Sequence, residues 1–415
     1  MIKKITLSIA ILYSVFSLAQ QSTSSPYSYF GIGDNKFKGT PEQRAMGGLG
    51  ILPDSTHINL SNPASYSSLW LTNISLSGTS TFNKQSTNQE SATSQRTSLD
   101  YLAIGIPMGK FGVGFGLNPQ TAVGYKIQTI NNDASAGNMF TGEGGSNRVF
   151  VGGAYQITPD LSFGIDANYY FGEINTIGRV LSSGTQYSTR FNNTVRVSGF
   201  GANLGLMYKT KVFEKYNLYT SATYSPEYEL DFERNASVGT IGYTQNGTEY
   251  YDDYVLLDPE KGKYTLPSKF SAGAGIGELR KWLFGTELVF TGKNNALPLS
   301  GSSVDYDSEN GMRVSLGGYY TPKYNSFTNY FQRVTYRAGL RYEKTGLIVN
   351  DKSINDMGIS LGAGLPIGNG FSDLTFVFEY GRRGTKANNL VREDYFNITV
   401  GLSITDKWFR KFLYD

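Results

Sequence analysis

Large apolar residues alternate with small or polar residues along most of the chain. Residues 111–117 place Phe, Val, Phe and Leu on one face and glycine on the other, and residues 161–169 repeat the scheme with Asp166 and Asn168 on the polar face. Similar runs continue from 312 to 404, whereas helical periodicity is scarce. A period of two residues predicts β-strands that each have one apolar face.

The length of these runs distinguishes between two all-β architectures. Strands of a soluble sandwich usually have about 5–6 residues. A transmembrane strand needs about 9–11 residues, turns its apolar face to lipid and keeps its polar face inward. Because most runs here are as long as a transmembrane strand requires, we predict an all-β fold, a transmembrane antiparallel β-barrel.

About fourteen strands are expected, an even number as in bacterial barrels. The expected ranges are 72–84, 96–108, 110–128, 146–158, 160–181, 186–208, 215–234, 262–279, 281–298, 311–322, 330–346, 355–366, 371–385 and 392–405. Tight turns near 109, 159–160, 279–280 and 367–370 alternate with longer connections at 129–145, 235–261 and 299–310. Short periplasmic turns and long outer loops are typical of outer-membrane barrels, so both chain ends are predicted to lie in the periplasm.

Aromatic residues gather near the ends of the predicted strands. They include Trp282, residues 169–171, the pair 319–320 and the pair 395–396. Amphipathic rings prefer the headgroup level of a membrane, so these residues are predicted to form interfacial girdles.

The first residues have the pattern of a secretory signal peptide. Lys3 and Lys4 precede a short apolar stretch, and a small residue, Ala19, ends a cleavage motif. The chain is therefore expected to comprise a signal peptide (1–19), an N-terminal segment (20–70), the barrel (71–405) and a periplasmic interfacial tail (406–415) rich in aromatic and basic residues.

Residues 20–70 do not alternate and contain the turn formers glycine and Asn-Pro. Irregular backbone cannot face lipid, but it can lie in a barrel lumen where its polar groups find partners. We therefore predict that this segment, called the hatch below, fills the lumen. Inward-facing glycines would leave room for such a chain or for an elongated ligand. These are Gly112, Gly114, Gly116, Gly199, Gly201, Gly205, Gly273, Gly275, Gly277, Gly358, Gly362 and Gly364.

Composition excludes several kinds of chemistry. The chain has no Cys and a single His, His57, so cysteine nucleophiles and Cys or His metal clusters are not expected. Asp54 and Ser55 precede His57, but this spacing does not specify a triad, so we predict no enzyme. We also predict no cofactor and no metal, since acidic pairs such as 252–253 lack calcium-loop spacing. The nearly neutral charge argues against nucleic-acid binding.

Several charged residues fall on the inward face of predicted strands. They are Asp166, Glu287, Arg337, Arg341, Glu343 and Glu379. Unpaired charge is costly in a lumen, so structural pairing of carboxylates with arginines is the favoured interpretation. The alternative is that some of them bind the polar head of a ligand.

The N-terminal segment also resembles the FadL family of outer-membrane transporters. Ala45-Met-Gly-Gly48, then Asp54, then Asn62-Pro-Ala64 are similar to the family pattern AxGGAG…D…NPAG, although Ser65 stands where the family has glycine. Residues 266–267 and 336–339 resemble two later family motifs. The resemblance covers nearly the whole mature chain and implies a fourteen-stranded barrel with an N-terminal hatch. The matching hatch positions are Gly47, Gly48, Asp54, Asn62, Pro63 and Ala64.

The resemblance implies two functions. The first is an outer-membrane channel for hydrophobic small molecules such as long-chain fatty acids. The second is an accessory barrel of a protein secretion or assembly complex, as some FadL-like barrels serve type IX secretion. The channel is the leading hypothesis, because the barrel, the hatch and the glycine-lined wall support it together with the resemblance. The altered hatch motif and the tyrosine-rich outer loops favour the second hypothesis, which is the alternative. The expected partners are outer-membrane lipid with either a hydrophobic ligand or an outer-membrane protein complex.

Overall fold

Antiparallel pairing continues around the whole molecule in the computed structural model and closes where β19 (Arg392–Asp406) pairs with β2 (Thr72–Ser86). The structure describes residues 23–130, 136–182, 187–213, 215–244, 246, 248–294, 306–368 and 372–408. The predicted signal peptide and residues 409–415 of the predicted tail lie outside them. None of the described helices is long and apolar enough to cross a membrane.

The wall of the barrel has fourteen strand positions, as the alternation predicted. Three positions are shared by consecutive strands. β8 and β9 both pair with β7, and β14 and β15 both pair with β16. β10, β11 and β12 form a single position, because β10 and β11 pair with β9 and β12 pairs with β8. The remaining strands after β2 are β3 (Ser91–Met108), β4 (Phe111–Ile130), β5 (Ala136–Gln156), β6 (Leu161–Ser182), β7 (Ser188–Val212), β8 (Tyr216–Ser225), β9 (Tyr228–Tyr243), β10 (Glu249–Leu256), β11 (Glu260–Leu266), β12 (Lys269–Glu278), β13 (Trp282–Thr291), β14 (Tyr306–Ser308), β15 (Gly311–Tyr320), β16 (Thr335–Val349), β17 (Lys352–Ile367) and β18 (Ser372–Arg383).

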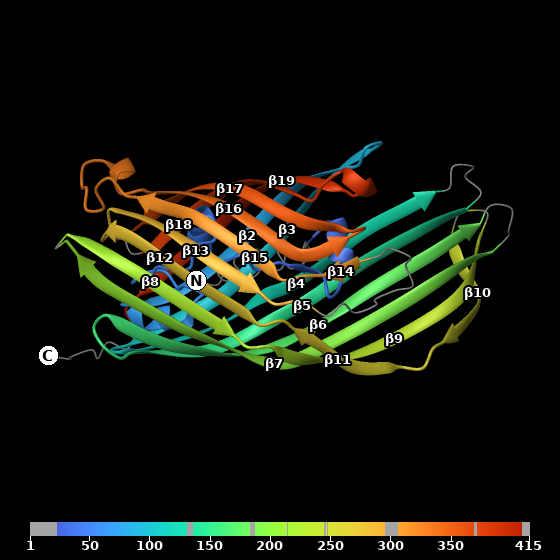
Figure 1. The fold of residues 1–415 in the computed structure, drawn as a ribbon, viewed down its shortest axis with the longest axis horizontal. Helices are drawn as coiled ribbons and strands as arrows, with labels where there is room; N and C mark the ends of the chain where they lie inside the picture. The colour runs from blue at the N-terminus through green and yellow to red at the C-terminus, as the bar shows by residue number, and fades with distance from the viewer. Residues whose placement is uncertain are drawn as a thin grey trace, which may run out of the picture.

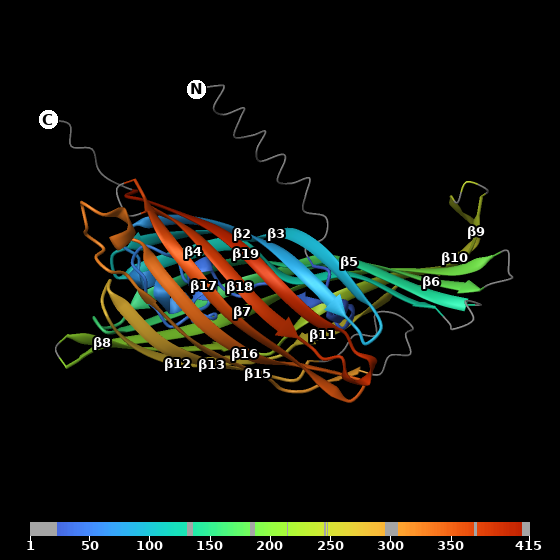
Figure 2. The ribbon, with the colours of Figure 1, turned by 90° about the horizontal axis from the view of Figure 1, so that it is seen from above.

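Strands on one side of the barrel are much longer than the others. The expectation of long loops at 129–145 and 235–261 is wrong, because most of these residues continue the ladders of β4, β5, β9 and β10. Together with the paired ends of β6 and β7 they form a sheet that projects beyond the rest of the wall (Figures 1 and 2). We call this sheet the extension: residues 121–130, 136–147, 171–182 and 188–198 with β9, β10 and β11.

The two faces of each wall strand follow the predicted register. Leu361 and Phe378 are about half exposed on the outside, at 57% and 47%, whereas the neighbours of Phe378, Val377 and Glu379, are buried inside. A barrel wall with apolar side chains outward and polar side chains inward matches the pattern expected in lipid.

The aromatic pairs do not all belong to outer girdles. Tyr320 and Phe396 are exposed on the outside, but Tyr395, which neighbours Phe396, is buried. Tyr170 is likewise buried between the exposed Tyr169 and Phe171. Consecutive residues of a strand point to opposite faces, so an aromatic pair supplies one ring to each side of the wall.

The hatch enters the lumen at one end and leaves it at the other. Near its first described residue, the hydroxyl of Ser24 lies 2.7 Å from that of Ser94, close to the β2–β3 hairpin. At the other end of the chain Asp406 pairs with Thr72, where β2 begins. The described chain therefore starts and finishes at opposite ends of the barrel. This differs from the expectation that both ends lie on one side, because the hatch crosses the length of the lumen before β2.

Candidate functional site in the barrel lumen

The hatch lies directly against the glycines of the inner wall. A Cβ atom added to Gly112 would come within 1.9 Å of the Tyr66 carbonyl oxygen, and one added to Gly339 within 2.1 Å of the Gly47 nitrogen. Gly205 is covered in the same way by Asn62. The space that glycines leave along the wall is thus occupied by the chain itself. Others of the predicted glycines, such as Gly199 and Gly201, face side chains of the wall itself.

At two hatch positions the backbone conformation itself requires glycine. Gly47 and Gly48 follow α2 (Pro41–Ala45) with φ angles of 73° and 93°, a region that favours glycine. The Gly47 N–H donates to the hydroxyl of Ser360 in β17 at 3.1 Å. This pair of glycines therefore turns the chain after α2 and joins it to the wall.

The Asn-Pro-Ala motif begins a short helix, η2 (Pro63–Ser68), and binds it to β7 and β8. The Asn62 side-chain oxygen accepts from the Ala64 N–H at 3.0 Å, and its amide nitrogen donates to the Leu206 carbonyl and the Ser221 hydroxyl, both at 3.0 Å. Ser65, which departs from the family pattern, donates to the Asn62 carbonyl at 2.8 Å. These motif residues act as structural ties between hatch and wall.

A buried network of charges holds α2 in the middle of the lumen. Arg44 lies 3.3 Å from the carboxylate of Asp100 and 3.2 Å from that of Glu379. Arg341 in β16 lies 2.9 Å from the other oxygen of Glu379 and 3.4 Å from Asp356. The sequence prediction included Glu379 and Arg341 but missed the other three. Asp356 precedes the outward-facing Met357 in an alternating run, so the same pattern could have identified it. Asp100 lies at a bulge, where the next residue, Tyr101, is buried as well, so alternation could not place it.

The other predicted lumen charges have different surroundings. Asp166 accepts from the Tyr66 hydroxyl at 3.4 Å, and Glu287 accepts from the N–H of Gly50, so both contact the hatch. Arg337 is buried, yet its Nη1 has no hydrogen-bond partner among the described residues. Of the two predicted lumen arginines, Arg341 is paired with carboxylates and Arg337 has no ion pair among the described residues.

His57 lies between two carboxylates near the end of the lumen where β2 begins. Its Nδ1 is 2.9 Å from Asp54 Oδ2, and its Nε2 is 3.2 Å from Asp373 Oδ2 in β18. Burial lowers the pKa of His57, but the charges of Asp373 and Asp54 outweigh burial and raise this pKa well above its usual value. Since both ring nitrogens face carboxylates, the described residues form no serine–histidine pair here.

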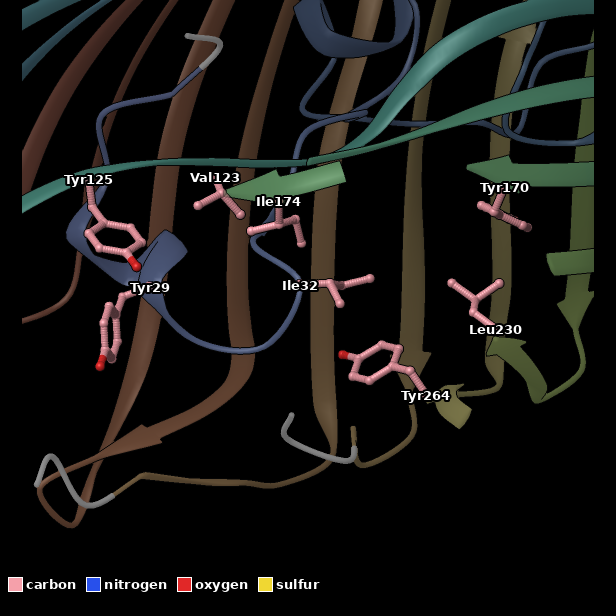
Figure 3. Packing of buried hydrophobic residues seen from close by; sticks show 8 residues of the cluster. All are labelled: Tyr29, Ile32, Val123, Tyr125, Tyr170, Ile174, Leu230 and Tyr264. Carbon is pink, nitrogen blue, oxygen red and sulfur yellow. The ribbon is translucent and has the colours of Figure 1, made fainter. Parts of the chain in front are cut away.

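An aromatic cluster fills the opposite part of the lumen, against the inner face of the extension (Figure 3). Tyr29 and Ile32 of the hatch pack against Val123, Tyr125, Tyr170, Ile174, Leu230 and Tyr264 from the inner face of β4, β6, β9 and β11. Tyr29 and Tyr125 meet edge to face with ring centres 5.0 Å apart. The N-terminal part of the hatch therefore fills the lumen as a hydrophobic core.

Two cavities differ greatly in size. The space among Arg44, Gly47 and Arg341 in the lumen has a volume of about 10 Å³, which is room for about one water molecule. An open hollow of about 1000 Å³ lies on the outer face of the extension, along β6, β7, β9 and β11, and its lining includes Glu173, Arg196 and Lys261. The larger space is thus in the projecting sheet, away from the hatch motif.

Solved structures with a similar fold are outer-membrane channels. TodX, a toluene transporter of Pseudomonas putida, is 17% identical with a TM-score of 0.60, covering 91% of this chain and 100% of its own. The toluene transporter TbuX of Ralstonia pickettii is 15% identical with a TM-score of 0.56, covering 88% and 97%. A FadL homologue of Pseudomonas aeruginosa is 11% identical with a TM-score of 0.56, covering 92% and 100%. At these identities the likeness shows the fold alone.

No curated protein matches the chain at a significant level. A family model does match, and it covers residues 1–415, the entire sequence. It describes the BamG family, whose name differs from that of the FadL family predicted from the hatch motif. The chain therefore belongs to the BamG family, and its fold is a FadL-like barrel of fourteen antiparallel strands closed around an N-terminal hatch.

Proposed function

We propose that this protein is a plugged outer-membrane barrel that serves as an accessory subunit of an outer-membrane protein complex. The observation that carries the proposal is the direct contact of hatch backbone with wall glycines such as Gly112, Gly164 and Gly339. Ligand sites are usually cavities of about 300–1,000 Å³ lined mainly by apolar side chains. The space beside Arg44 and Arg341 is far smaller and is lined by paired charges.

The extension supplies a surface on which a partner could bind. Glu173, Arg196, Glu233 and Lys261 lie in register on four neighbouring strands and form a row on the outer face of this sheet. Neighbours in the row alternate in sign, with Arg196 Nε 2.9 Å from the Glu173 carboxylate. A lipid-facing Arg or Lys at the bilayer midplane costs about 2–4 kcal/mol. The row therefore supports placing the extension outside the membrane, where it can contact protein.

Membership of the BamG family is compatible with this role, because it assigns the chain to a group other than the transporters whose fold it shares. The barrel fold supports a place in the outer membrane, with the charged extension on the outer side and the tight turns on the periplasmic side.

Purification of the full-length chain in mild detergent tests the proposal. We expect a protein partner in a fixed stoichiometry, and reversal of charge in the variant Arg196→Glu with Lys261→Glu should reduce its recovery. The matched control is Lys110→Glu, an exposed residue in the turn at the other end of the barrel. Purification of the barrel without a partner contradicts the proposal. Equal recovery of the partner with the double charge-reversal variant and with Lys110→Glu contradicts it as well.

A second candidate is uptake of hydrophobic small molecules, which the fold of TodX and of the FadL homologue favours. Uptake requires the hatch to move, and Arg337 would supply a buried cation for a carboxylate head group. A lipid bound to the purified protein, together with transport into cells, would support this candidate over the accessory role.

A further inference from the structure

Three possible metal ligands from separate segments converge where the hatch meets β18. Glu42 comes from α2, His57 from the hatch loop and Asp373 from the wall, and one ligand atom of each lies within 4.8 Å of the others. We propose that these residues bind a divalent transition metal, with Zn²⁺ as the preferred ion, and that the metal fastens the hatch to the wall. This site would be independent of any partner or transported ligand.

The imidazole of His57 is oriented as a metal ligand requires. Asp54 Oδ2 lies 2.9 Å from Nδ1, and Asp54 is itself held by the N–H of Thr56 at 2.9 Å. A carboxylate on one ring nitrogen fixes the tautomer that directs the other nitrogen to a metal. Asp54 would therefore orient His57 without touching the ion.

The remaining nitrogen of His57 is buried without a hydrogen bond. Nε2 lies 3.2 Å from Asp373 Oδ2, yet the geometry of this contact is not that of a hydrogen bond, and no other described atom bonds to Nε2. Meanwhile the Thr375 hydroxyl contacts both carboxylates, at 3.2 Å from Glu42 and 3.2 Å from Asp373. Nε2 of His57 is thus directed toward the carboxylates of Glu42 and Asp373, which both contact the Thr375 hydroxyl.

The charge balance of the cluster also favours a cation. Glu42, Asp54 and Asp373 bring three negative charges, and Arg337, which approaches Gly364 beside Asp373, brings one positive charge. A divalent cation would offset this excess of negative charge, and excess buried charge is unfavourable.

The donor set suits zinc. Zn²⁺ takes imidazole nitrogen and carboxylate oxygen at about 2.0–2.2 Å, and a site with three protein ligands keeps a fourth position for water. In such a tetrahedron the ligand atoms lie roughly 3.4 Å apart, so those within 4.8 Å would have to move closer by side-chain rotation. Because the ligands belong to hatch and wall alike, binding would resist withdrawal of the hatch.

The full-length protein in detergent, first stripped with EDTA, provides the test. Titration with ZnCl₂, followed by elemental analysis, should give a single bound zinc per chain and a higher melting temperature, and CoCl₂ should give the visible absorption of tetrahedral cobalt. His57→Gln should abolish binding, and Asp54→Asn should weaken it by about 10–100-fold, as expected for a residue that orients a ligand. Asp166→Asn, another inward carboxylate, is the control and should bind normally.

The change of electrophoretic mobility on heating reports whether each variant has folded. If His57→Gln fails to fold, Glu42→Gln takes its place in the comparison. Absence of stoichiometric zinc from the wild-type protein overturns the proposal and leaves an ion pair of His57 with Asp54 and Asp373. Zinc binding of equal affinity in His57→Gln and wild type overturns it as well, since the metal would then lie elsewhere.

Discussion

At the scale of single residues, glycine determines how closely the hatch approaches the wall. Gly339 meets Met46 and Gly47, and Gly362 meets Ala45, so these two wall glycines approach the hatch at a distance that no larger side chain allows. Charged residues then hold this close contact in place, since Arg44 of the hatch lies between carboxylates of the wall. The position of the hatch therefore depends both on the wall glycines and on the charged residues that pair across the contact.

Replacement of Gly339 by Ala should weaken the attachment of the hatch. The added Cβ would lie 2.1 Å from backbone atoms of Met46 and Gly47, which cannot move aside as a flexible side chain could. Overpacking of this kind costs about 1–3 kcal/mol. We expect a lower melting temperature and faster proteolysis within the hatch. Gly153→Ala is the control, because open space surrounds the Cβ at that position. Equal behaviour of the two variants would contradict the close contact.

At the scale of elements, the two faces of a strand make different contacts. In β17, Leu361 is exposed on the outside while the next residue, Gly362, meets Ala45 of α2. The extension uses the same alternation differently: its inner face joins the aromatic cluster with Tyr29, and its outer face carries the charged row with Arg196.

A pair of adjacent arginine substitutions tests the register of the wall. Leu361→Arg places a charge toward lipid, which costs about 2–4 kcal/mol near the midplane, and should impair insertion. Gly362→Arg should instead leave the outer surface unchanged and displace α2, since its Cβ would lie 2.5 Å from that of Ala45. The amounts of folded barrel in the outer membrane and of protease-resistant hatch report the two effects. Equal assembly of both variants would mean that the register is wrong.

The extension should loosen in acid. Burial raises the pKa of Glu249 in β10, but hydrogen bonds from Arg190 and Arg179 outweigh burial and hold this pKa below its usual value. Its contribution to stability is therefore complete above the ordinary glutamate pKa of about 4.3 and is lost as the pH falls through the lowered folded value. The protection factors of β10 amides, which correct hydrogen exchange for its intrinsic pH dependence, should fall over that range in the wild type. In Glu249→Gln the protection factors should already be low at neutral pH and should change little with acid.

At the scale of the whole molecule, the barrel closes without help from the hatch. The ladder from β2 through β19 returns to β2, and within the described residues the hatch adds one short strand, β1 (Asp34–Asn35), which pairs with β4. The hatch is held by side-chain bonds, glycine contacts and the aromatic cluster with Tyr29. The wall and its plug are therefore separable in principle, although they bury each other.

Deletion of residues 22–65 should leave a folded barrel with an open lumen. The wall retains its hydrogen bonds, whereas carboxylates such as Glu287 and Asp100 lose their hatch partners and become exposed to water. Planar-bilayer conductance should rise from near zero to that of an open pore. Conductance equal to that of the intact protein would mean that the hatch does not fill the lumen.

The role of Arg337 separates the two candidate functions. If the barrel transports fatty acids, Arg337→Ala removes the unpaired buried cation and should reduce uptake of a long-chain fatty acid with no change in barrel amount. If the barrel is an accessory subunit, neither the wild type nor Arg337→Ala should take up the fatty acid, and recovery of the protein partner should be the same for both. Arg280→Ala, a substitution in the exposed β12–β13 turn, controls for a general loss of positive charge.

The sequence alone determined the architecture, because period-two alternation and run length are local properties that each strand carries. Fourteen strands and their inward and outward faces follow from these properties, and the absence of alternation before Thr72 predicted the lumen segment. The tertiary structure decided which charged side chains pair with one another. Arg44 with Glu379, and His57 with Asp373, are more than 300 residues apart in the chain, so no spacing could reveal them. It also decided that most residues of 129–145 and 235–261 extend a sheet, because strand residues beyond the membrane need only a paired neighbour and no apolar alternation.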